Sequence, residues 1–448
     1  MSAVQSSGEP IDSPEWPRPA IAWYAVIILM LAYTFSYIDR TILSLLVDPI
    51  RRDLDISDTQ ISLLHGLAFA LFYTIMGIPI ARWADRGNRR NIVAWGVCVW
   101  SLLTAVCGLA KNFWQLFLAR VGVGVGEAAL SPAAYSMIAD LFPKEKLGRA
   151  LGVYAMGVFF GVGLAYIIGG AVIGMVAALP PVSLPVIGEI RPWQMTFFAV
   201  GLPGLLVALL ILTIREPERR ASARRAPSIV EVVEFFRHNK LTFVCHFAGF
   251  SMLTMLYNGI FAWAPTFFIR TYDFTASQAG YYLGLQTLVF GTSGILTGGI
   301  LADRLVRRGY SDGTIRTGIL AAVALAPFAV TATLAPNATL SLLLFCPLTF
   351  FISFPFGAAA AGLQSITPNQ MRAQISAMYL FIVNLIGIGA GPTVTALITD
   401  YVFKDDQAVR YSMSAVSAVG SLGAVLILWI GLRPFRESAA RVSAAAPA

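Results

Sequence analysis

The decapeptide ARWADRGNRR occupies residues 81–90, and a second decapeptide, GILADRLVRR, occupies residues 299–308. Both follow the order small–x–apolar–Ala–Asp–Arg–x–x–Arg–Arg, and they start 218 residues apart. Arginine alone would be weak support for a repeat, because basic residues are common in loops, but the shared Ala-Asp-Arg at matching places is strong. The pair predicts a chain built from two similar halves.

The composition is that of a protein that crosses a membrane many times. Of the 448 residues, 57% are hydrophobic and 12% are charged, and the mean hydropathy is +0.71. A soluble protein carries about 25% charged residues, so a large soluble core is a poor explanation. The net charge of +8 would suit a nucleic-acid partner, but the basic residues are placed as expected for loops that set the orientation of a membrane protein. No nucleic acid is therefore expected as a partner.

Twelve apolar runs are long enough to cross a bilayer, which takes roughly 20 residues. They lie at 20–48, 58–82, 91–110, 112–141, 147–177, 192–214, 241–269, 276–302, 314–335, 338–364, 373–401 and 409–432. Two parallel halves of six spans, with a pathway between them, are an architecture of transporters. The predicted domains are an N-terminal tail (1–19), two six-helix bundles (20–214 and 241–432), a linker (215–240) that ends in a segment compatible with an amphipathic helix, and a C-terminal tail (433–448).

Lysine and arginine are distributed unequally over the two faces of this arrangement. Both termini and 23 of the 32 basic residues fall on one face, whereas 7 fall on the other and Arg40 and Arg120 lie inside spans. Loops rich in Lys and Arg stay in the cytoplasm. We therefore expect both tails and the linker to be cytoplasmic.

Four charged residues lie inside apolar runs. Asp39 and Arg40 interrupt LAYTFSYIDRTILSLLV (31–47), and Arg120 and Glu127 lie in the fourth run. Asp39 and Arg120 are each nine residues from the outer end of their run, so both are predicted about 13 Å below that boundary, with Glu127 roughly 10 Å deeper. A charge at this depth costs at least ~2.5–3.5 kcal/mol and requires a partner or an aqueous cavity.

These four residues suggest proton coupling. Burial and a neighbouring arginine act on a carboxylate in opposite directions, so a site that holds both can change salt-bridge partners when a proton binds. Our hypothesis is that Asp39 and Glu127 bind protons and that Arg40 and Arg120 are their exchangeable partners. Arg40 is also a candidate to bind an anionic head group. The alternatives are an interfacial position for Asp39 and Arg40, a structural hydrogen-bonding role for Arg120 and a purely structural role for Glu127.

The second half is chemically different from the first. At the 218-residue offset, Asp39 and Arg40 correspond to the neutral Tyr257 and Asn258. Together with Phe261, Gln286 and Phe354, we expect these residues to form an aromatic and neutral polar wall. A cavity with one charged and one aromatic wall suits an amphipathic substrate, and the alternative is that the aromatic side chains face lipid or the core.

The repeated decapeptides resemble the signature between spans two and three of the major facilitator superfamily, although Ala81 and Asn88 stand where that signature has glycine. FLARVGVGVGEAAL (117–130) resembles its span-four signature, in which Arg120 would be the arginine. The pairing of YIDR (37–40) with this stretch is similar to the Spinster family, which implies transport of lysolipids and sphingoid lipids. The glycine-rich run at 152–170 lacks the Gly-Pro of superfamily antiporters, so antiport is not inferred from it.

The resemblance also implies a gate. In the superfamily, the aspartate of the repeated decapeptide helps to hold the cytoplasmic face shut, in part by facing the positive end of a neighbouring helix. The corresponding cytoplasmic gate residues of this chain are Asp85, Arg86, Arg89, Arg90, Asp303 and Arg304.

The sequence therefore predicts an all-helical membrane protein of twelve spans, in two pseudo-symmetric six-helix bundles of the major facilitator fold. We expect it to carry an amphipathic lipid, a lysophospholipid or sphingoid lipid, by proton-coupled alternating access. The rivals are a proton-coupled drug or organic-anion transporter and an uncoupled facilitator. A membrane-embedded lipid enzyme is disfavoured, because the sequence shows no His/Asp cluster, no Ser-His-Asp set at one depth and no metal-ligand spacing. We expect no catalytic residue, metal or cofactor, with lipid substrate, protons and membrane lipids as partners of a monomer in a bacterial inner membrane.

Overall fold

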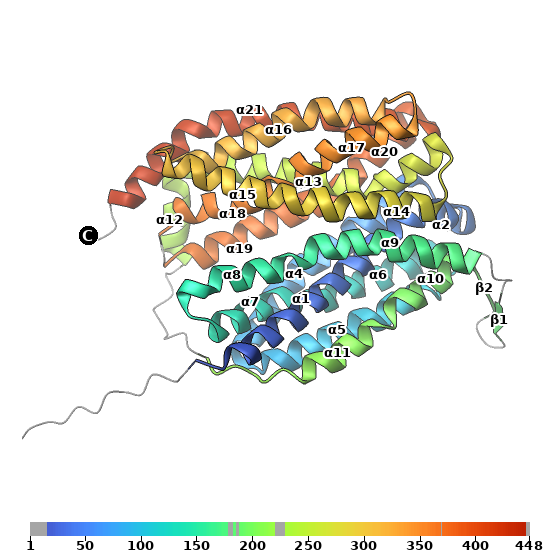
Figure 1. Ribbon diagram of the computed structural model, residues 1–448, viewed down its shortest axis with the longest axis horizontal. Coiled ribbons are helices and arrows are strands. Elements are labelled where there is room, and N and C mark those ends of the chain that lie inside the picture. The colour runs from blue at the N-terminus through green and yellow to red at the C-terminus, as the bar shows by residue number, and fades with distance from the viewer. Residues whose placement is uncertain (1–15, 178–181, 185–187, 220–228, 369, 445–448) are drawn as a thin grey trace, which may run out of the picture.

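The chain forms two helical halves that lie side by side, with the blue-to-green half largely below the yellow-to-red half in Figure 1. The computed structural model describes residues 16–177, 182–184, 188–219, 229–368 and 370–444. Within these residues, twelve helical segments are long and apolar enough to cross a membrane, which confirms the twelve predicted runs. Parts of the predicted tails and linker, residues 1–15, 220–228 and 445–448, lie outside the described residues.

The first half supplies six of these segments. In chain order its helices are α1 (Pro19–Thr41), α2 (Val47–Leu54), α3 (Asp58–His65), α4 (Leu67–Arg86), α5 (Arg89–Cys107), α6 (Phe113–Glu127), α7 (Leu130–Leu141), α8 (Lys144–Ala155), α9 (Gly157–Ala177), α10 (Pro192–Gly201) and α11 (Gly204–Leu212), and the 3-10 turn η1 (Ile42–Leu45) prolongs α1. Two short antiparallel strands, β1 (Val182–Leu184) and β2 (Gly188–Ile190), lie between the fifth and sixth segments.

The second half supplies the other six. Its helices are α13 (Lys240–Tyr272), α14 (Ala276–Gln286), α15 (Thr292–Arg307), α16 (Gly313–Thr333), α17 (Ala338–Ser353), α18 (Pro355–Ser365), α19 (Arg372–Val383), α20 (Gly391–Leu397) and α21 (Val409–Ala444), with the 3-10 turn η5 (Asp406–Ala408) before α21. Three π-helical turns, η2 (Thr287–Gly291), η3 (Asn384–Ala390) and η4 (Ile398–Phe403), interrupt the eighth and eleventh segments. These turns were not predicted from the sequence.

Proline breaks two of the spans near their middle. Pro132 follows the junction of α6 and α7, and Pro355 starts α18. Because proline has no N–H, it cannot donate the helical hydrogen bond to the carbonyl four residues earlier. The first break leaves Glu127 as the last residue of α6, so its carboxylate lies at a helix end inside the span.

The linker and the chain's C-terminal part pack together. Residues of the linker form α12 (Ile229–His238), which runs across the ends of the spans at the left of Figure 1. α21 continues to Ala444, beyond the bundle boundary predicted at residue 432. Phe435 and Ala439 of this extension are buried in one cluster with Val232 of α12 and Phe243 of α13. Apolar burial therefore keeps the extension helical and fixed to the second half.

Spans three and four approach each other closely through glycine. A Cβ added to Gly126 would lie 2.9 Å from the backbone nitrogen of Trp100, and one added to Gly96 would lie 2.8 Å from the Gly126 carbonyl oxygen. Backbone atoms cannot move aside as a flexible side chain can. The glycine run that contains Gly126 thus serves close helix packing.

Gly126→Leu is expected to destabilise the protein by about 1–3 kcal/mol, the usual effect of overpacking a tight core. The measurement is the thermal unfolding midpoint of purified protein in detergent. Gly77→Leu is the matched control, because a Cβ at Gly77 meets nothing within 4 Å. An unchanged midpoint for Gly126→Leu would show that the two helices have room to separate.

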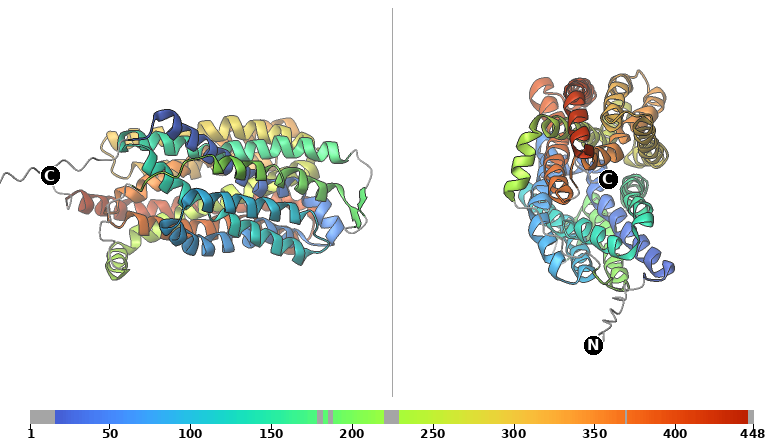
Figure 2. Two further views of the ribbon diagram at one scale, coloured as in Figure 1. Left: turned by 90° about the horizontal axis from the view of Figure 1, so that it is seen from below. Right: turned by 90° about the vertical axis from the view of Figure 1, so that its left-hand side faces the viewer.

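The two halves meet along α9 and α14 and where α4 faces η3. A Cβ on Gly284 would lie 2.6 Å from the Gly163 carbonyl oxygen, and one on Gly66 would lie 2.6 Å from that of Ile388. We call the end of the molecule with α2 and the start of α3 the closed end, and the end where α4 passes into α5 the basic end. Figure 1 shows the closed end at the right, and the right-hand view of Figure 2 looks at the basic end.

Candidate functional site

A cavity of about 430 Å³ lies between the two halves, on the basic-end side of their contact. Its polar lining residues are Tyr33, Tyr37, Arg40, Thr41, Ser44, His65 and Tyr135 from the first half and Thr254, Tyr257, Asn258, Tyr379 and Asn384 from the second. Among the described residues that line it, Arg40 alone carries a permanent charge, and no aspartate or glutamate lines it. The rest of the wall is apolar or aromatic, which suits a substrate with one charged end and an apolar body.

Arg40 stands between the cavity and Glu127. Its Nε and Nη2 atoms each lie 2.6 Å from Oε2 of Glu127, and Ser36 donates a hydrogen bond to the same oxygen. The guanidinium also lies over the ring of Phe69, 4.2 Å from its centroid. Glu127 is 1% exposed and does not line the cavity, so the guanidinium is the group that a substrate would meet first.

Arg120 and Asp39 form a second buried pair, as their predicted depths suggested. The contact runs through the backbone: Nη1 of Arg120 donates to the carbonyl oxygen of Asp39 at 3.1 Å, and its Nε donates to that of Leu64 at 3.4 Å. The carboxylate oxygens of Asp39 accept no hydrogen bond from the described residues. Burial without a hydrogen-bonding partner penalises the charge of a carboxylate strongly.

The wall from the second half contains three of the five predicted residues. Tyr257, Asn258 and Phe261 line the cavity, with the rings of Tyr257 and Phe261 4.5 Å apart. Gln286 instead lies 3.5 Å from the hydroxyl of Thr349, and Phe354 packs beside Phe350 at 4.9 Å, so neither is among the lining residues. Their depth follows from the sequence, but the direction in which each side chain points does not.

Most of the polar lining residues were not predicted as site residues, and His65 and Asn384 are two examples. His65 ends α3, and its buried Nε2 has no hydrogen-bond partner among the described residues. Asn384 starts the π-helical turn η3. Each is a polar residue in an apolar run, which is a signal that could have selected them, but that signal alone does not separate a lining residue from a packed one.

Ion pairs join the halves at the closed end. Arg270 of α13 binds Asp58 through two bonds of 2.6 and 2.9 Å and binds Asp48 at 2.7 Å. Asp58 is fully buried, and the side chain of Arg270 is 5% exposed. No role was predicted for these residues, because Arg270 is separated from Asp48 and Asp58 by more than 200 residues in the chain.

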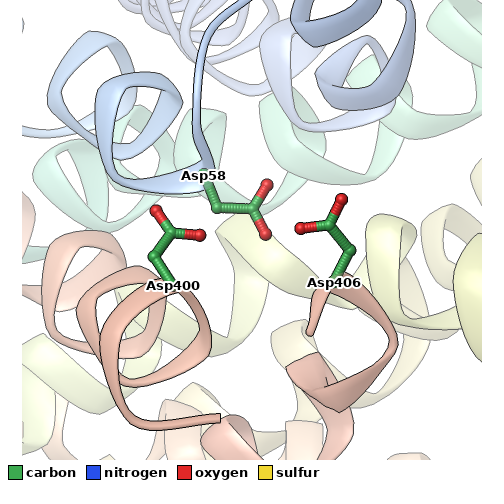
Figure 3. Close-up of side chains that lie close together, drawn as sticks. All are labelled: Asp58, Asp400 and Asp406. Carbon is green, nitrogen blue, oxygen red and sulfur yellow. The ribbon is translucent and has the colours of Figure 1, made fainter. Parts of the chain in front are cut away.

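A second set of contacts crosses at the same end. Arg51 binds Asp406 at 2.8 Å, and the backbone and hydroxyl of Thr59 donate to Asp400 at 2.7 and 2.6 Å. Figure 3 shows Asp58, Asp400 and Asp406 gathered from both halves. One carboxylate oxygen from each lies within 4.8 Å of the other two. Guanidinium, N–H and hydroxyl groups already bind oxygens of all three carboxylates, so the cluster functions as an ion-pair network rather than as an open cation site.

At the basic end the predicted gate residues divide into two groups. Asp85, Arg86, Asp303 and Arg304 are exposed. Arg89 is buried and binds Asp140 and Glu216, the latter at 2.7 Å, and the backbone N–H of Arg90 donates to Glu216. Arg89 and Arg90 therefore tie elements of the first half together, whereas the four exposed residues are available for contacts when this end closes.

The sequence profile described as Major Facilitator Superfamily matches residues 29–392. The chain belongs to this superfamily. Its members are transporters, so the chain is an integral membrane transporter and not an enzyme.

Superfamily members of known name and structure cover nearly the whole chain. It is 30% identical to an MFS-type efflux pump of Mycolicibacterium smegmatis, over 98% of both chains, and 26% identical to a probable L-galactonate transporter of Escherichia coli, over 92% of this chain and 90% of that one. A crystal structure of a bacterial homolog to the human lysosomal transporter Spinster, inward-facing and unoccupied, superposes with a TM-score of 0.76 at 27% identity, covering 96% of this chain and 100% of that one. The superfamily fold and the similarity to Spinster are thus confirmed.

Asp85→Asn is expected to raise the fraction of molecules whose basic end is open by about two- to fivefold, since a charge facing a helix terminus contributes about 0.3–1 kcal/mol. The measurement is the labelling rate of a cysteine placed at the cavity residue Ala155. Glu437→Gln is the control, because Glu437 pairs with Arg433 on its own helix. Equal labelling rates in the wild-type protein and in Asp85→Asn would show that the Asp85 charge has no role in the gate.

Proposed function

We propose that the chain is a proton-coupled transporter of an amphipathic lipid, a lysophospholipid or sphingoid lipid with an anionic head group. The observation that carries the proposal is the position of Arg40, which lines the cavity and forms an ion pair with the buried Glu127. One guanidinium thus stands between a buried carboxylate and the space for a substrate.

The coupling follows from competition for that guanidinium. A proton on Glu127 removes its charge and weakens its hold on Arg40, because the Coulomb attraction between the carboxylate and the guanidinium is lost. Arg40 then becomes available to a phosphate or carboxylate, for which its planar fork is well suited. Asp39 is the second proton site in this proposal, and Arg120 keeps its backbone in place.

The aromatic wall and the similarity to Spinster support a lipid as the substrate. Tyr257, Phe261 and Phe356 form a continuous aromatic surface, with the ring of Tyr257 4.9 Å from that of Phe356. Such a surface is suited to an acyl or alkyl chain, and the guanidinium to its head group.

We further propose that the basic end faces the cytoplasm of a bacterial inner membrane. The excess of basic residues on that face supports this orientation. The structure, closed at the opposite end, would then be inward-facing, like the Spinster homolog that it resembles.

The test is flux of a labelled lysophospholipid into liposomes that contain the purified protein, with and without an imposed pH gradient. Flux that the gradient accelerates is the expected result. Flux that does not depend on the gradient would indicate an uncoupled facilitator. The absence of flux would exclude the lysophospholipid as a substrate.

A drug or organic anion is a second candidate, favoured by the similarity to an efflux pump and to a probable L-galactonate transporter. Competition separates the candidates in the same liposomes. A sugar acid or a cationic dye that blocks lysolipid flux at micromolar concentration would favour this alternative, whereas blocking by alkyl phosphates would favour the lipid.

A further inference from the structure

Asn384 presents an unused carboxamide to the cavity. It lines the wall among the apolar residues Val383, Leu380 and Ile388, and its side chain makes no hydrogen bond to the described residues. A carboxamide offers two N–H donors and a carbonyl acceptor, and polar groups in partly buried positions are usually satisfied. A ligand or water must therefore supply the partner.

Helix packing fixes the depth of this carboxamide. η3 and α20 lie against α13 so that Gly387 packs on Thr254 and Gly391 packs on Asn258. Counting back from Gly387 places Asn384 level with Ser251, seven residues from Asn258. At 1.5 Å per residue, Asn384 lies about 10 Å nearer the basic end than Asn258.

Asn258 in turn marks the depth of Arg40. The 218-residue repeat relates the two positions, on α13 and α1, and both side chains line the cavity. The backbones of Arg40 and Asn384 are therefore about 10 Å apart along the cavity. The side chain of Arg40 covers part of this distance, because its guanidinium lies over the rings of Phe69 and Tyr73 on α4. The cavity thus offers one charged and one neutral polar group near each other. A simple alkyl anion would use the charged group and leave the neutral one unpaired.

The π-helical turn that contains Asn384 also forms part of the contact between the two halves. Asn384 starts η3, and Ile388 and Gly389 near its end touch the backbone of Gly66 in the first half. Single π-helical turns inside α-helices are frequent at functional sites. A ligand bound to Asn384 thus contacts the same helical turn that joins the two halves.

We propose that Asn384 is a specificity-determining residue that binds a neutral hydrogen-bonding group of the substrate, an ester, amide or hydroxyl, located between its anionic head and its apolar chain. The substrate class is an anionic amphiphile with such a polar link between head and chain. This inference rests on the proposed function, because it takes Arg40 as the head-group site.

Two probes test it: a 1-acyl glycerol phosphate, which carries an ester and a hydroxyl, and an alkyl phosphate of equal chain length, which carries neither. The wild-type protein is expected to transport the acyl glycerol phosphate about tenfold faster, the effect of one good hydrogen bond. Asn384→Leu is expected to abolish this preference by slowing the acyl glycerol phosphate about tenfold while the alkyl phosphate is unchanged. Asn384→Gln is expected to restore part of the preference.

Thr393→Val is the matched control, because Thr393 follows the same turn and donates to Gly389 without lining the cavity. It should leave the preference intact. Equal wild-type rates for the two probes, or equal slowing of both in Asn384→Leu, would overturn the inference while leaving the proposed function in place. If the wild-type protein carries neither probe, the proposed function itself fails, and the inference fails with it.

Discussion

Glu127→Gln will remove the dependence of transport on a pH gradient. Glutamine keeps the shape and the hydrogen bond from Ser36 but cannot exchange a proton, so Arg40 loses its charged partner in every state of the cycle. The loss of this charge-assisted contact costs about 1.5–3 kcal/mol, enough to change the occupancy of the head-group site by tenfold or more. Gradient-driven lysolipid flux in liposomes is the measurement, with counterflow of the same lipid reporting whether binding survives.

Glu216→Gln is the matched control for this result. Glu216 also pairs with an arginine, Arg89, at 2.7 Å, but lies away from the cavity. Asp39→Asn should likewise reduce the pH dependence if Asp39 is the second proton site. Unchanged pH profiles in both Asp39→Asn and Glu127→Gln would end the proton-coupling proposal.

Arg270→Gln will open the closed end. It removes the two bonds to Asp58 and the contact with Asp48, and leaves the fully buried carboxylate of Asp58 with Arg51 at 3.2 Å as its remaining ion pair. Breaking a buried ion pair by removing one partner costs about 3–5 kcal/mol. The ratio of molecules open at this end to molecules closed should therefore rise by roughly a hundredfold or more. Distances between spin labels across that end measure the ratio.

Two further variants define what this result means. Arg270→Gln combined with Asp58→Asn should recover part of the closed population, because no buried charge is then left without its partner. Arg191→Gln should leave the ratio unchanged, since Arg191 pairs with Asp53 of its own half, at 2.5 Å. If Arg270→Gln stays closed, the glycine contacts along α9 and α14 hold this end without help from the ion pairs.

The sequence was sufficient for the fold because a membrane limits how a chain can be arranged. A run of about 20 apolar residues must be a span, since a lipid-exposed backbone has to satisfy its own hydrogen bonds. The repeated Ala-Asp-Arg then divided the spans into two halves. The same cost of burying charge selected Asp39, Arg40, Arg120 and Glu127. The structure places them in two buried pairs, and Arg40 is the one of the four that lines the cavity.

The remaining parts of the site depend on features that composition does not encode. Gln286 and Phe354 lie at suitable depths, but the rotation of their helices turns them away from the lining. The rotation of a helix about its axis depends on packing against its neighbours and on π-helical turns such as η3. No local sequence pattern predicted these turns. The partners of Arg270 were hidden for a similar reason, because Asp48 and Asp58 lie more than 200 residues away from it in the chain.

The ion pairs of the closed end leave an imbalance of charge when the halves separate. The first half takes with it Asp48, Arg51 and Asp58, and the second takes Arg270, Asp400 and Asp406. Each wall of the opened mouth then carries one excess negative charge from this set. Such walls repel each other through water over about 8 Å at physiological ionic strength, and less in concentrated salt. Salt on that one side of the membrane therefore weakens this contribution to the repulsion between the walls, without any ion binding at a fixed place.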